Sequence, residues 1–393
     1  MTATDPAAGP ALRVALDVSA VPDQLVGAGH YIVQLTRQLS ARPDVDLVLF
    51  SRAGDRDRWS PWVAPGNLVA TAPDRRPLRL AWEQLRLGSL VTASGASVHH
   101  GPHYTMPERT TVPTVVTVHD LSFFDSPQWH ERSKVVVFRR AIARAAREAA
   151  VVVCPSRVTA DALHRWCRVE AEVVVAPHGV DTVRFRPEEP EPGGDAGRLA
   201  ALDPRLTGDR PLLVFVGTLE PRKDVPTLVR AFASVTDRHP EARLVLAGGR
   251  GWGADAVDAA VAATGHRDRI VRPGYVSDGD IPVLLRAATA VVYPSLYEGF
   301  GLPALEALAC GATLVTTRGT AMEEVAGNSA LLVPPGDAGA LSDTLDAVLT
   351  GSGDDRAASE RRSLGFDVVG RHTWERSADL HVAAYRRAAA GRR

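Results

Sequence analysis

The sequence predicts an α/β protein of two doubly wound parallel domains. Short apolar segments of the kind found in buried strands alternate with segments of helical periodicity from residue 12 onward. After a stretch rich in proline, glycine and acidic residues at 187–197, expected to be a linker, the same alternation begins again. Because strands that alternate with helices form parallel sheets covered on both faces, each half of the chain should form its own doubly wound domain.

The first half contains the predicted elements of one sheet. Residues 12–18 form the first strand, and a helix follows because Tyr31, Leu35 and Leu39 recur on one helix face. Ser156 is placed as the N-cap of a later helix. The other predicted elements are strand 45–50, helix 78–90, strand 112–118, a basic helix from about residue 131, and strands 150–154 and 169–177.

The second half repeats this pattern and ends in a long helix. Its predicted elements are strands 212–217, 242–249, 270–276, 290–295, 312–317 and 330–335, with a helix at 227–238. At the end of the chain, Trp374, Leu380 and Tyr385 stand in helical register. We therefore expect an N-terminal domain over 1–183, a second domain over 184–371, and a C-terminal helix over 372–393 that packs back on the first domain.

Composition and charge exclude several classes of function. The formal net charge of −1 argues against a nucleic-acid binder that works by bulk electrostatics. The three cysteines show no CxxC pairing, which argues against a zinc site or a disulfide framework and favours a reduced compartment. No segment approaches the ~20 apolar residues that span a bilayer. Since the first residues also lack the features of a signal peptide, we expect a cytoplasmic protein.

The stretch 293–311, YPSLYEGFGLPALEALACG, carries the strongest functional pattern in the chain. An apolar strand runs into a loop of small residues, Pro303 suits the first turn of a helix, and Gly311 suits the position just past its end. Backbone amides at a helix N-terminus form a site for phosphate. The amides expected there belong to Gly299, Phe300, Gly301 and Leu302.

Two carboxylates, Glu298 and Glu306, flank these amides. Carboxylates repel phosphate, so they suit a ligand that also carries hydroxyl groups, from which they accept hydrogen bonds. A sugar nucleotide has both, with hydroxyls on its ribose and hexose and a diphosphate between them. The alternative is a strand–turn–helix unit with two solvated glutamates, and only the surrounding residues decide between the two interpretations.

Other strand ends add residues of matching chemistry. Arg222 and Lys223 lie in a loop that begins at Gly217, and their two positive charges match a diphosphate. The alternative for this pair is an exposed basic surface. Gly27 and Gly29 form a predicted glycine loop after the first strand, where the backbone can approach a ligand closely, although these residues also suit a tight turn.

Polar residues also follow strands of the first half. His119 and Asp120 end an unbroken apolar strand, which directs them toward the carboxyl edge of the sheet. We assign His119 to hold a hexose by hydrogen bonds to its hydroxyls, with a structural histidine as the alternative. His103 and Tyr104 are candidates for an acceptor-facing loop. The histidines near them lack the carboxylate or thiol spacing that would support a metal site.

Two further patterns are less specific. Arg140, Arg144 and Arg147 form one basic stripe on a predicted helix, which is either solvated or faces an anionic lipid surface such as the inner face of the plasma membrane. The sequence GGRGWG at 248–253 mimics a dinucleotide-binding fingerprint. Because the next strand end offers no acidic residue for a ribose hydroxyl, we discount it.

Together these motifs resemble the retaining glycosyltransferases of family 4. The resemblance rests on YEGFGLPALEALACG and the upstream loop GTLEPRKD, and it extends over most of the chain through TVHDLSFFDSPQWH, CPSRVTAD, PHGVD and TWERSA. It implies the GT-B fold, in which two doubly wound Rossmann-like domains face each other across a cleft. The first domain would bind the acceptor and the second the nucleotide-sugar donor.

The resemblance also implies roles for the site residues. Glu298 would bind the transferred hexose and Glu306 the ribose. The other implied contacts are those of the Phe300, Gly301 and Leu302 amides with hexose and phosphate, of Arg222 and Lys223 with the distal phosphate, and of the backbone at Tyr275 and Val276 with the base. Such enzymes keep the anomeric configuration and need no metal or other cofactor. The implied route is front-face: the leaving diphosphate takes the acceptor's proton, and His119 positions the sugar.

The segment HDLSFF is similar to that of bacterial mannosyltransferases. This similarity favours transfer of mannose from GDP-mannose to a glycan or lipid-linked acceptor in polysaccharide or glycolipid synthesis. Three alternatives stay open. They are a transferase that uses a UDP-sugar (glucose or N-acetylglucosamine), a sugar-nucleotide 2-epimerase on the same fold, and a non-catalytic binder of nucleotide sugars.

Overall fold

The computed structural model describes residues 11–23, 25, 27–188, 193–351 and 355–391. Contacts divide the chain into two units. The first unit holds the residues up to His178 together with those from Trp374 onward, and the second runs from Gly179 to Thr373. The first unit therefore takes its last helix from the far end of the sequence. In the described ranges, no helix combines the length and the apolar character needed to cross a bilayer.

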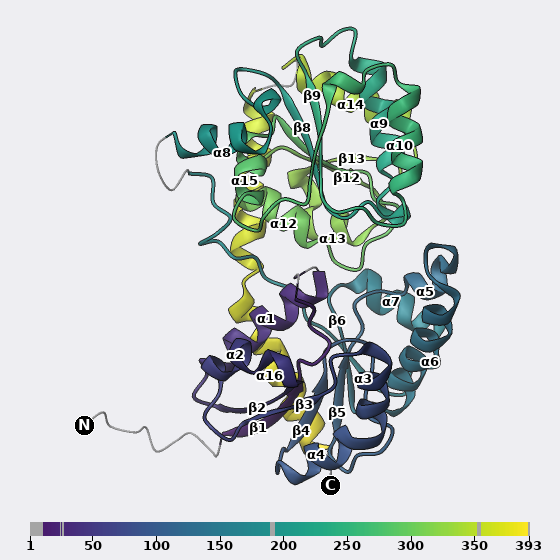
Figure 1. The fold of residues 1–393 in the computed structure, drawn as a ribbon, viewed down its shortest axis with the longest axis vertical. Helices are drawn as coiled ribbons and strands as arrows, with labels where there is room; N and C mark the ends of the chain where they lie inside the picture. Colours follow the sequence, from purple (N-terminus) through teal and green to yellow (C-terminus); the bar gives the residue numbers. More distant parts are fainter. Residues whose placement is uncertain (1–10, 24, 26, 189–192, 352–354, 392–393) are drawn as a thin grey trace, which may run out of the picture. The chain divides into compact units, whose positions relative to one another are not determined.

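The first unit contains a seven-stranded parallel sheet in the order β3-β2-β1-β4-β5-β6-β7 (Figure 1). The strands are β1 (Leu12–Asp17), β2 (Val45–Arg52), β3 (Leu68–Ala72), β4 (Val98–Gly101), β5 (Thr114–Thr117), β6 (Val151–Cys154) and β7 (Glu172–Val175). The helices are α1 (Gly27–Ser40), α2 (Arg56–Trp59), α3 (Arg76–Trp82), α4 (Gly88–Ala93), α5 (Ser122–Asp125), α6 (Arg132–Glu148), α7 (Arg157–Trp166) and α16 (Trp374–Ala390), with a π-helical segment, Glu83–Leu87, between α3 and α4.

The second unit contains a six-stranded parallel sheet in the order β10-β9-β8-β11-β12-β13. Its strands are β8 (Leu212–Val216), β9 (Arg243–Ala247), β10 (Ile270–Gly274), β11 (Ala290–Tyr293), β12 (Leu314–Thr317) and β13 (Ala330–Val333). Its helices are α8 (Gly194–Leu202), α9 (Val225–Val235), α10 (Ala254–Ala263), α11 (Ile281–Ala287), α12 (Leu302–Ala309), α13 (Ala321–Ala326), α14 (Ala338–Leu349) and α15 (Asp355–Arg371).

In each sheet the strand order reverses beside the first strand. The reversal lies between β1 and β4 in the first unit and between β8 and β11 in the second. At such a point the loops that leave two neighbouring strands diverge to opposite faces, and open α/β sheets bind ligands there. The α/β class and the parallel sheets agree with the prediction from the alternating pattern.

Some predicted elements differ from the structure. Strands β3 and β4 had no prediction, because β3 is only partly buried and β4 is short and rich in histidine. The linker predicted at 187–197 is wrong at its end, since Gly194 already begins α8. Its residues 189–192 lie outside the described residues. Ser156 is an N-cap as predicted: its side chain accepts a hydrogen bond from the Thr159 amide at 3.0 Å.

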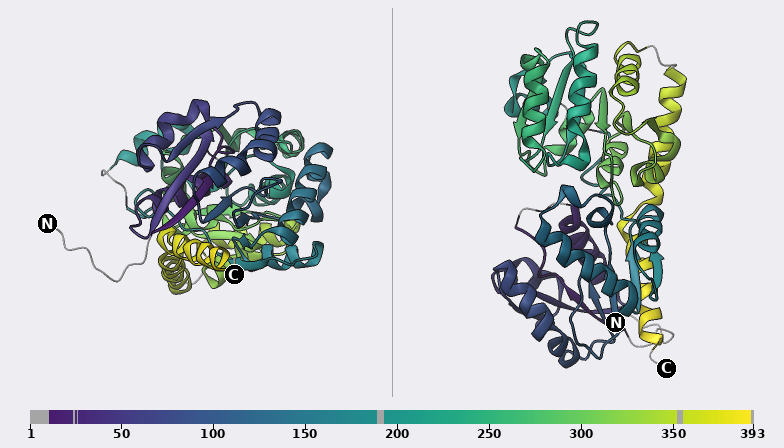
Figure 2. Two further views of the ribbon diagram at one scale, coloured as in Figure 1. Left: turned by 90° about the horizontal axis from the view of Figure 1, so that it is seen from below. Right: turned by 90° about the vertical axis from the view of Figure 1, so that its right-hand side faces the viewer.

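A buried polar network attaches α16 to the first unit, where α16 runs along β4, β5 and β6 (yellow in Figure 2). The Tyr31 hydroxyl lies 2.8 Å from both Thr117 Oγ1 and His381 Nε2. His100 contacts Thr117 Oγ1 at 2.8 Å and the Tyr385 hydroxyl at 2.7 Å. Two residues of α16 are therefore connected to α1, β4 and β5 by hydrogen bonds that have no access to solvent.

Burial keeps the histidines of this region neutral. It lowers the pKa of His381 to about 4 and the pKa of His99 to about 3, and it holds the pKa of His100 well below its usual value. His99 is fully buried, and in the described part of the chain neither of its ring nitrogens has a hydrogen-bond partner. Protonation of these rings inside the fold is therefore strongly disfavoured.

We predict that acid unfolds the first unit before the second. Below pH 6.5 the unfolded chain takes up protons on histidines that stay neutral in the fold, so each of them lowers the stability by about 1.4 kcal/mol per pH unit until its folded pKa is reached. Six of the seven tryptophans lie in the first unit. Tryptophan fluorescence should therefore change at a higher pH than the helical circular dichroism signal of the whole chain.

The matched variant is His99→Leu, which removes one titrating ring without removing a hydrogen bond. Its fluorescence midpoint should move to lower pH. A midpoint that stays in place in the variant, or a circular dichroism change that precedes the fluorescence change, would contradict the role assigned to the buried histidines.

Candidate functional site

The loops after β8 and β11 meet at the reversal point of the second sheet. Arg222 and Lys223 lie in a short 3-10 turn, Pro221–Lys223, that follows β8. The Leu296 amide, in the loop after β11, donates to the Arg222 carbonyl at 2.8 Å. This backbone hydrogen bond fixes the turn that carries the two cations beside the loop that carries Glu298.

Glu298 forms ion pairs with both cations. Its Oε2 lies 2.5 Å from Arg222 Nη1, and its Oε1 lies 3.4 Å from Lys223 Nζ. Ser295 Oγ also donates to Oε1, at 3.2 Å. The side chains of Lys223 and Glu298 are only 8% and 10% exposed. The structure thus brings together three residues that the sequence placed on two different strand ends.

The electrostatics of Glu298 follow from these contacts. Burial by itself opposes ionisation of the carboxyl group, but the charges of Arg222 and Lys223 outweigh burial and hold the pKa of Glu298 below its ordinary value. Glu298 is therefore a carboxylate throughout the neutral pH range. As an anion it can only accept hydrogen bonds, which suits it to the cations or to the hydroxyls of a ligand.

Gly301 turns the chain from Glu298 into helix α12. Its φ is +112°, and a Cβ at this position would lie 2.8 Å from Met322 Cγ. Only glycine combines this left-handed conformation with so close an approach. The helix then begins at Leu302, has Pro303 in its first turn and ends at Ala309, close to the predicted bounds. The N-terminus of α12 therefore follows directly on the loop of Glu298.

Glu306 lies one turn into α12 and has a different environment. Burial raises the pKa of Glu306 to about 7; Arg184 and Lys223 oppose this rise, and Asp278 adds to it. Lys223 thus acts electrostatically on both glutamates of the motif, and Glu306 is poised to lose its proton near neutral pH.

The glycine-rich segment 248–253 supports the turn that carries the cations. A Cβ at Gly248 would lie 2.1 Å from the Gly217 carbonyl oxygen, and one at Gly251 would lie 2.6 Å from the Leu219 carbonyl oxygen. The Leu219 amide donates to the Gly249 carbonyl at 3.1 Å. The glycines therefore serve close backbone packing against residues 217–221. In the sequence these glycines mimic a cofactor motif, and their supporting role has no local signal.

The turn after β10, predicted to face a base, is joined to the same group of loops. The Gly248 amide donates to the Gly274 carbonyl at 2.7 Å. Next to it, Tyr275 is 58% exposed while Val276 is buried. An exposed aromatic ring at this position is free to stack on a planar ligand.

The predicted residues of the first unit also gather in one place. His119 Nε2 donates to the Pro102 carbonyl at 2.8 Å, and the His119 ring lies 5.9 Å from the His103 ring. The Tyr104 hydroxyl donates to Asp120 at 2.8 Å. Burial lowers the pKa of His119. A neutral ring that donates through Nε2 keeps Nδ1 as an acceptor, which is able to bind a hydroxyl group.

A buried acid pair in the first unit had no signal in the sequence. Asp17 ends β1, and Glu83 lies in the π-helical segment; both are buried. Burial, followed by the charge of Asp17, raises the pKa of Glu83 to about 8. Glu83 looks like any helix-surface glutamate in the sequence, because only the tertiary fold buries it. In the described part of the chain, no three metal-ligating side chains cluster closely enough to hold an ion.

Two predicted features of the first unit are wrong. Gly27 and Gly29 do not form a loop, because α1 already begins at Gly27 and both residues lie in its first turn. Nor do the three arginines of α6 form a free stripe. Arg144 is only 16% exposed; it pairs with Glu148 at 2.8 Å and Glu108 at 3.1 Å. It also donates to the Pro107 carbonyl, so it holds α6 against a neighbouring loop.

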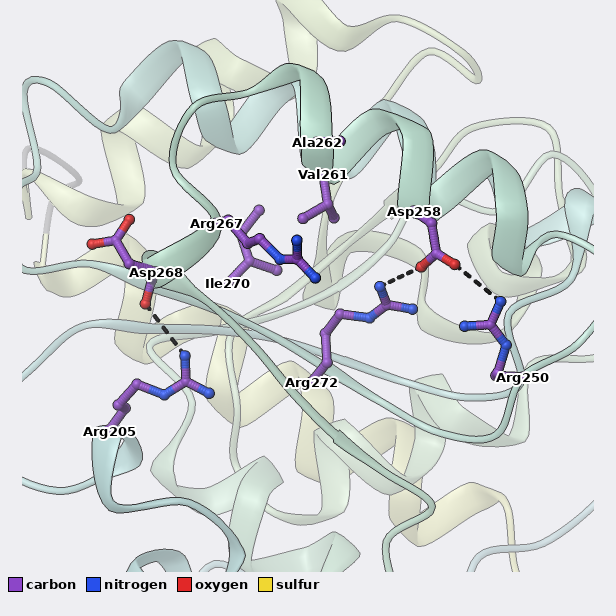
Figure 3. A pocket seen from close by; sticks show the side chains of 9 residues that line it. All are labelled: Arg205, Arg250, Asp258, Val261, Ala262, Arg267, Asp268, Ile270 and Arg272. Atoms are coloured by element: carbon purple, nitrogen blue, oxygen red, sulfur yellow. Dashed lines mark hydrogen bonds and ion pairs between the residues drawn. The ribbon is translucent and has the colours of Figure 1, made fainter.

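A cavity of about 770 Å³ lies along the edge strand β10 and helix α10, and its lining includes none of the residues predicted to bind a donor (Figure 3). Its lining residues are Arg205, Arg250, Asp258, Val261, Ala262, Arg267, Asp268, Ile270 and Arg272. Arg250 and Arg272 both pair with Asp258, so these two side chains hold α10 to the sheet. We assign no ligand to this cavity.

Comparison with known proteins agrees with the geometry. Residues 26–184 match the family described as Glycosyltransferase Family 4, and residues 203–363 match Glycosyl transferases group 1. The chain is 29% identical to O-antigen chain mannosyltransferase B of Escherichia coli, over 92% of this chain and 96% of the relative. It is 32% identical to D-inositol 3-phosphate glycosyltransferase of Actinosynnema mirum, over 91% of each.

Solved structures show the same fold. Sucrose-phosphate synthase from Thermosynechococcus elongatus superposes with a TM-score of 0.74 at 23% identity, over 95% of this chain and 98% of that one. A glycosyltransferase from Rickettsia africae superposes with a TM-score of 0.73 at 16% identity, over 96% and 98%. Two parallel α/β units, the paired-glutamate motif and these matches lead to one assignment: the chain belongs to the retaining glycosyltransferases of family 4, which are hexosyltransferases with the GT-B fold.

Proposed function

We propose that the enzyme transfers mannose from GDP-mannose to a hydroxyl group of a glycan or lipid-linked acceptor, with retention and without a metal ion. The observation that carries the proposal is the cluster of Arg222 with the buried Glu298 and Lys223 beside the N-terminus of α12. Cations and helix amides suit a diphosphate, and the carboxylate suits the hydroxyls of a sugar. A nucleoside diphosphate sugar combines the two.

The protein contributes to the chemical step mainly by stabilising the charge that develops on the leaving group. The bond between the sugar C1 and the diphosphate oxygen breaks, and the acceptor oxygen bonds to C1 on the same face. The proton of the acceptor hydroxyl passes to the leaving diphosphate. Arg222 and Lys223 stabilise the negative charge that develops on that group. In this proposal Glu298 holds the hexose, Glu306 holds the ribose, and the exposed ring of Tyr275 stacks on the base.

Sequence similarity supports mannose as the transferred sugar and guanine as the base of the donor. The HDLSFF segment, 119–124, resembles that of bacterial mannosyltransferases, and one relative over nearly the whole chain is an O-antigen chain mannosyltransferase. Other relatives at comparable identity are D-inositol 3-phosphate glycosyltransferases. The UDP-sugar that the sequence left open is the second candidate donor.

A peripheral contact with anionic lipid is a further part of the proposal. On α6, Val136 is 69% exposed and Val137 is 44% exposed, and the exposed residues Arg132 and Arg140 lie on the same helix. Exposed aliphatic side chains next to cations suit the boundary between lipid headgroups and acyl chains. Arg144 is withdrawn from this surface by its ion pairs.

A donor screen tests the function. We expect GDP-mannose to raise the melting temperature more than UDP-glucose, UDP-N-acetylglucosamine or ADP-glucose, since a ligand at 100 times its Kd stabilises by roughly 2.7 kcal/mol. Arg222→Ala should abolish the shift and lower kcat/KM about a hundredfold or more. Arg210→Ala, an exposed arginine 3.8 Å from its carboxylate partner, is the control. A shift that persists in Arg222→Ala would refute the site, and product formed without acceptor would indicate an epimerase.

Removal of divalent metal ions should leave the rate unchanged. Arg222 and Lys223 already supply the positive charge that a metal ion would bring to a diphosphate. The measurement is mannose transfer in the presence of excess EDTA, compared with the same assay in millimolar Mg²⁺ or Mn²⁺. A loss of activity that added metal restores would show that the two cations are not sufficient.

Glu306→Gln should raise the stability of the second unit and weaken donor binding. Because burial raises the folded pKa of Glu306 to about 7, the second unit loses stability as pH rises from the unfolded value of 4.5 toward 7. The neutral glutamine avoids this cost, so the variant should be more stable at pH 8 by about 2–3 kcal/mol. It should also bind the donor about tenfold more weakly, because the charged acceptor for ribose hydroxyls is gone.

The measurements are denaturant unfolding and donor titration at pH 8, with the exposed Glu241→Gln as the matched control. Equal stability of Glu306→Gln and wild type at pH 8 would contradict the buried, ionised carboxylate. Unchanged donor affinity would contradict its contact with the ribose.

A further inference from the structure

Arg222 lies between two carboxylates in the structure. Its Nε is 2.7 Å from Glu220 Oε2, and its Nη1 is 2.5 Å from Glu298 Oε2. The side chain of Glu220 is 35% exposed, whereas that of Glu298 is 10% exposed. The two acids contact different edges of the guanidinium group, so a ligand can replace one of them and leave the other in place.

Glu298, the buried partner, forms ion pairs with the same two cations that the donor's diphosphate needs. With no ligand present, Glu298 offsets much of the charge of Arg222 and Lys223. A diphosphate that binds these cations brings more negative charge beside Glu298, and repulsion in this poorly solvated place is strong. Glu298 must then exchange its cations for other hydrogen-bond donors. In a sugar nucleotide, the hexose hydroxyls are such donors.

The backbone around Glu298 is fixed, so the exchange involves side chains only. The Ser295 carbonyl accepts a hydrogen bond from Thr317 Oγ1, and the Leu296 amide is bound to the Arg222 carbonyl. Both loops are therefore anchored on either side of the ion pair. Glu298 can move from the cations toward a sugar by rotation of its own side chain, while Ser295 stays within reach of its carboxylate.

We propose that Glu298 competes with the donor's diphosphate for Arg222 and Lys223, and that Glu220 is a positioning residue that keeps Arg222 aimed at the diphosphate when Glu298 releases it. This inference rests on the proposed function of the site. The two acids then have opposite effects on diphosphate binding by Arg222: Glu298 weakens it and Glu220 strengthens it.

The competition has a consequence for turnover. A nucleoside diphosphate without its hexose offers Glu298 no hexose hydroxyls in place of the cations, so it binds less well than the intact donor. After transfer, the hexose leaves with the acceptor, and Glu298 returns to Arg222 and Lys223. The return displaces the diphosphate product, and the site discriminates between substrate and product.

Calorimetric titration with GDP, UDP and ADP, and with the matching sugar nucleotides, tests the inference. Glu298→Gln should bind the nucleoside diphosphate about tenfold more tightly than wild type, because the competing charge is gone. The ratio of its affinities for donor and diphosphate should fall, and transfer should be lost. Glu220→Gln should bind both ligands about fivefold more weakly, with partial rescue by Glu220→Asp. Glu241→Gln should match wild type.

Each part of the inference is refuted by a different result. If wild type binds a diphosphate and folded Glu298→Gln binds it no more tightly, the competition is refuted while the transferase function stands. If Glu220→Gln keeps wild-type affinity, the positioning role is refuted. If wild type binds none of the nucleotides or sugar nucleotides, the proposed function itself fails. Glu298→Asp, too short to span both cations, should bind the diphosphate with intermediate affinity and provides the same test should the glutamine variant not fold.

Discussion

The ion pairs of Glu298 with Arg222 and Lys223 are the interaction on which the rest of the site depends. A carboxylate and an ammonium group that are both almost fully buried cost several kcal/mol each in lost hydration, and this cost is offset only while they contact each other or a ligand of the right charge. The surrounding chain serves that contact. The glycines at 248–253 pack the turn of the cations, the Leu296 amide joins it to the next loop, and Ser295 supports the carboxylate.

The parallel sheet explains why the sequence was enough to predict that these residues lie at the same edge. Residues that follow buried parallel strands lie at one edge of the sheet, so Arg222, Lys223 and Glu298 could be placed there from their strands alone. Their ion pairs could not be predicted, because they form only when β8 and β11 are neighbours in the sheet. The local pattern of apolar residues does not determine the order of the strands. The same limit hid the role of residues 248–253, whose glycines are needed only because β9 lies beside β8.

The errors of sequence analysis have similar causes. Helical spacing showed that Arg140, Arg144 and Arg147 share a face, but not that Glu108 and the Pro107 carbonyl lie against that face and engage Arg144. Gly27 and Gly29 were placed in a loop because glycine lets the backbone approach a ligand closely, but α1 already begins at Gly27. The Tyr31, His100 and His381 network joins residues up to 350 positions apart, which no local pattern reveals.

The two glutamates of the motif differ in their electrostatic environment. Arg222 and Lys223 hold Glu298 ionised, whereas burial raises the pKa of Glu306 to about 7. Lys223 acts on both, so a diphosphate that takes this cation removes positive charge from two acids at once. A bare diphosphate would leave both acids short of partners. In the proposed function, a nucleoside diphosphate sugar supplies ribose hydroxyls to Glu306 and hexose hydroxyls to Glu298, so both acids gain hydrogen-bond donors when the cations bind the diphosphate.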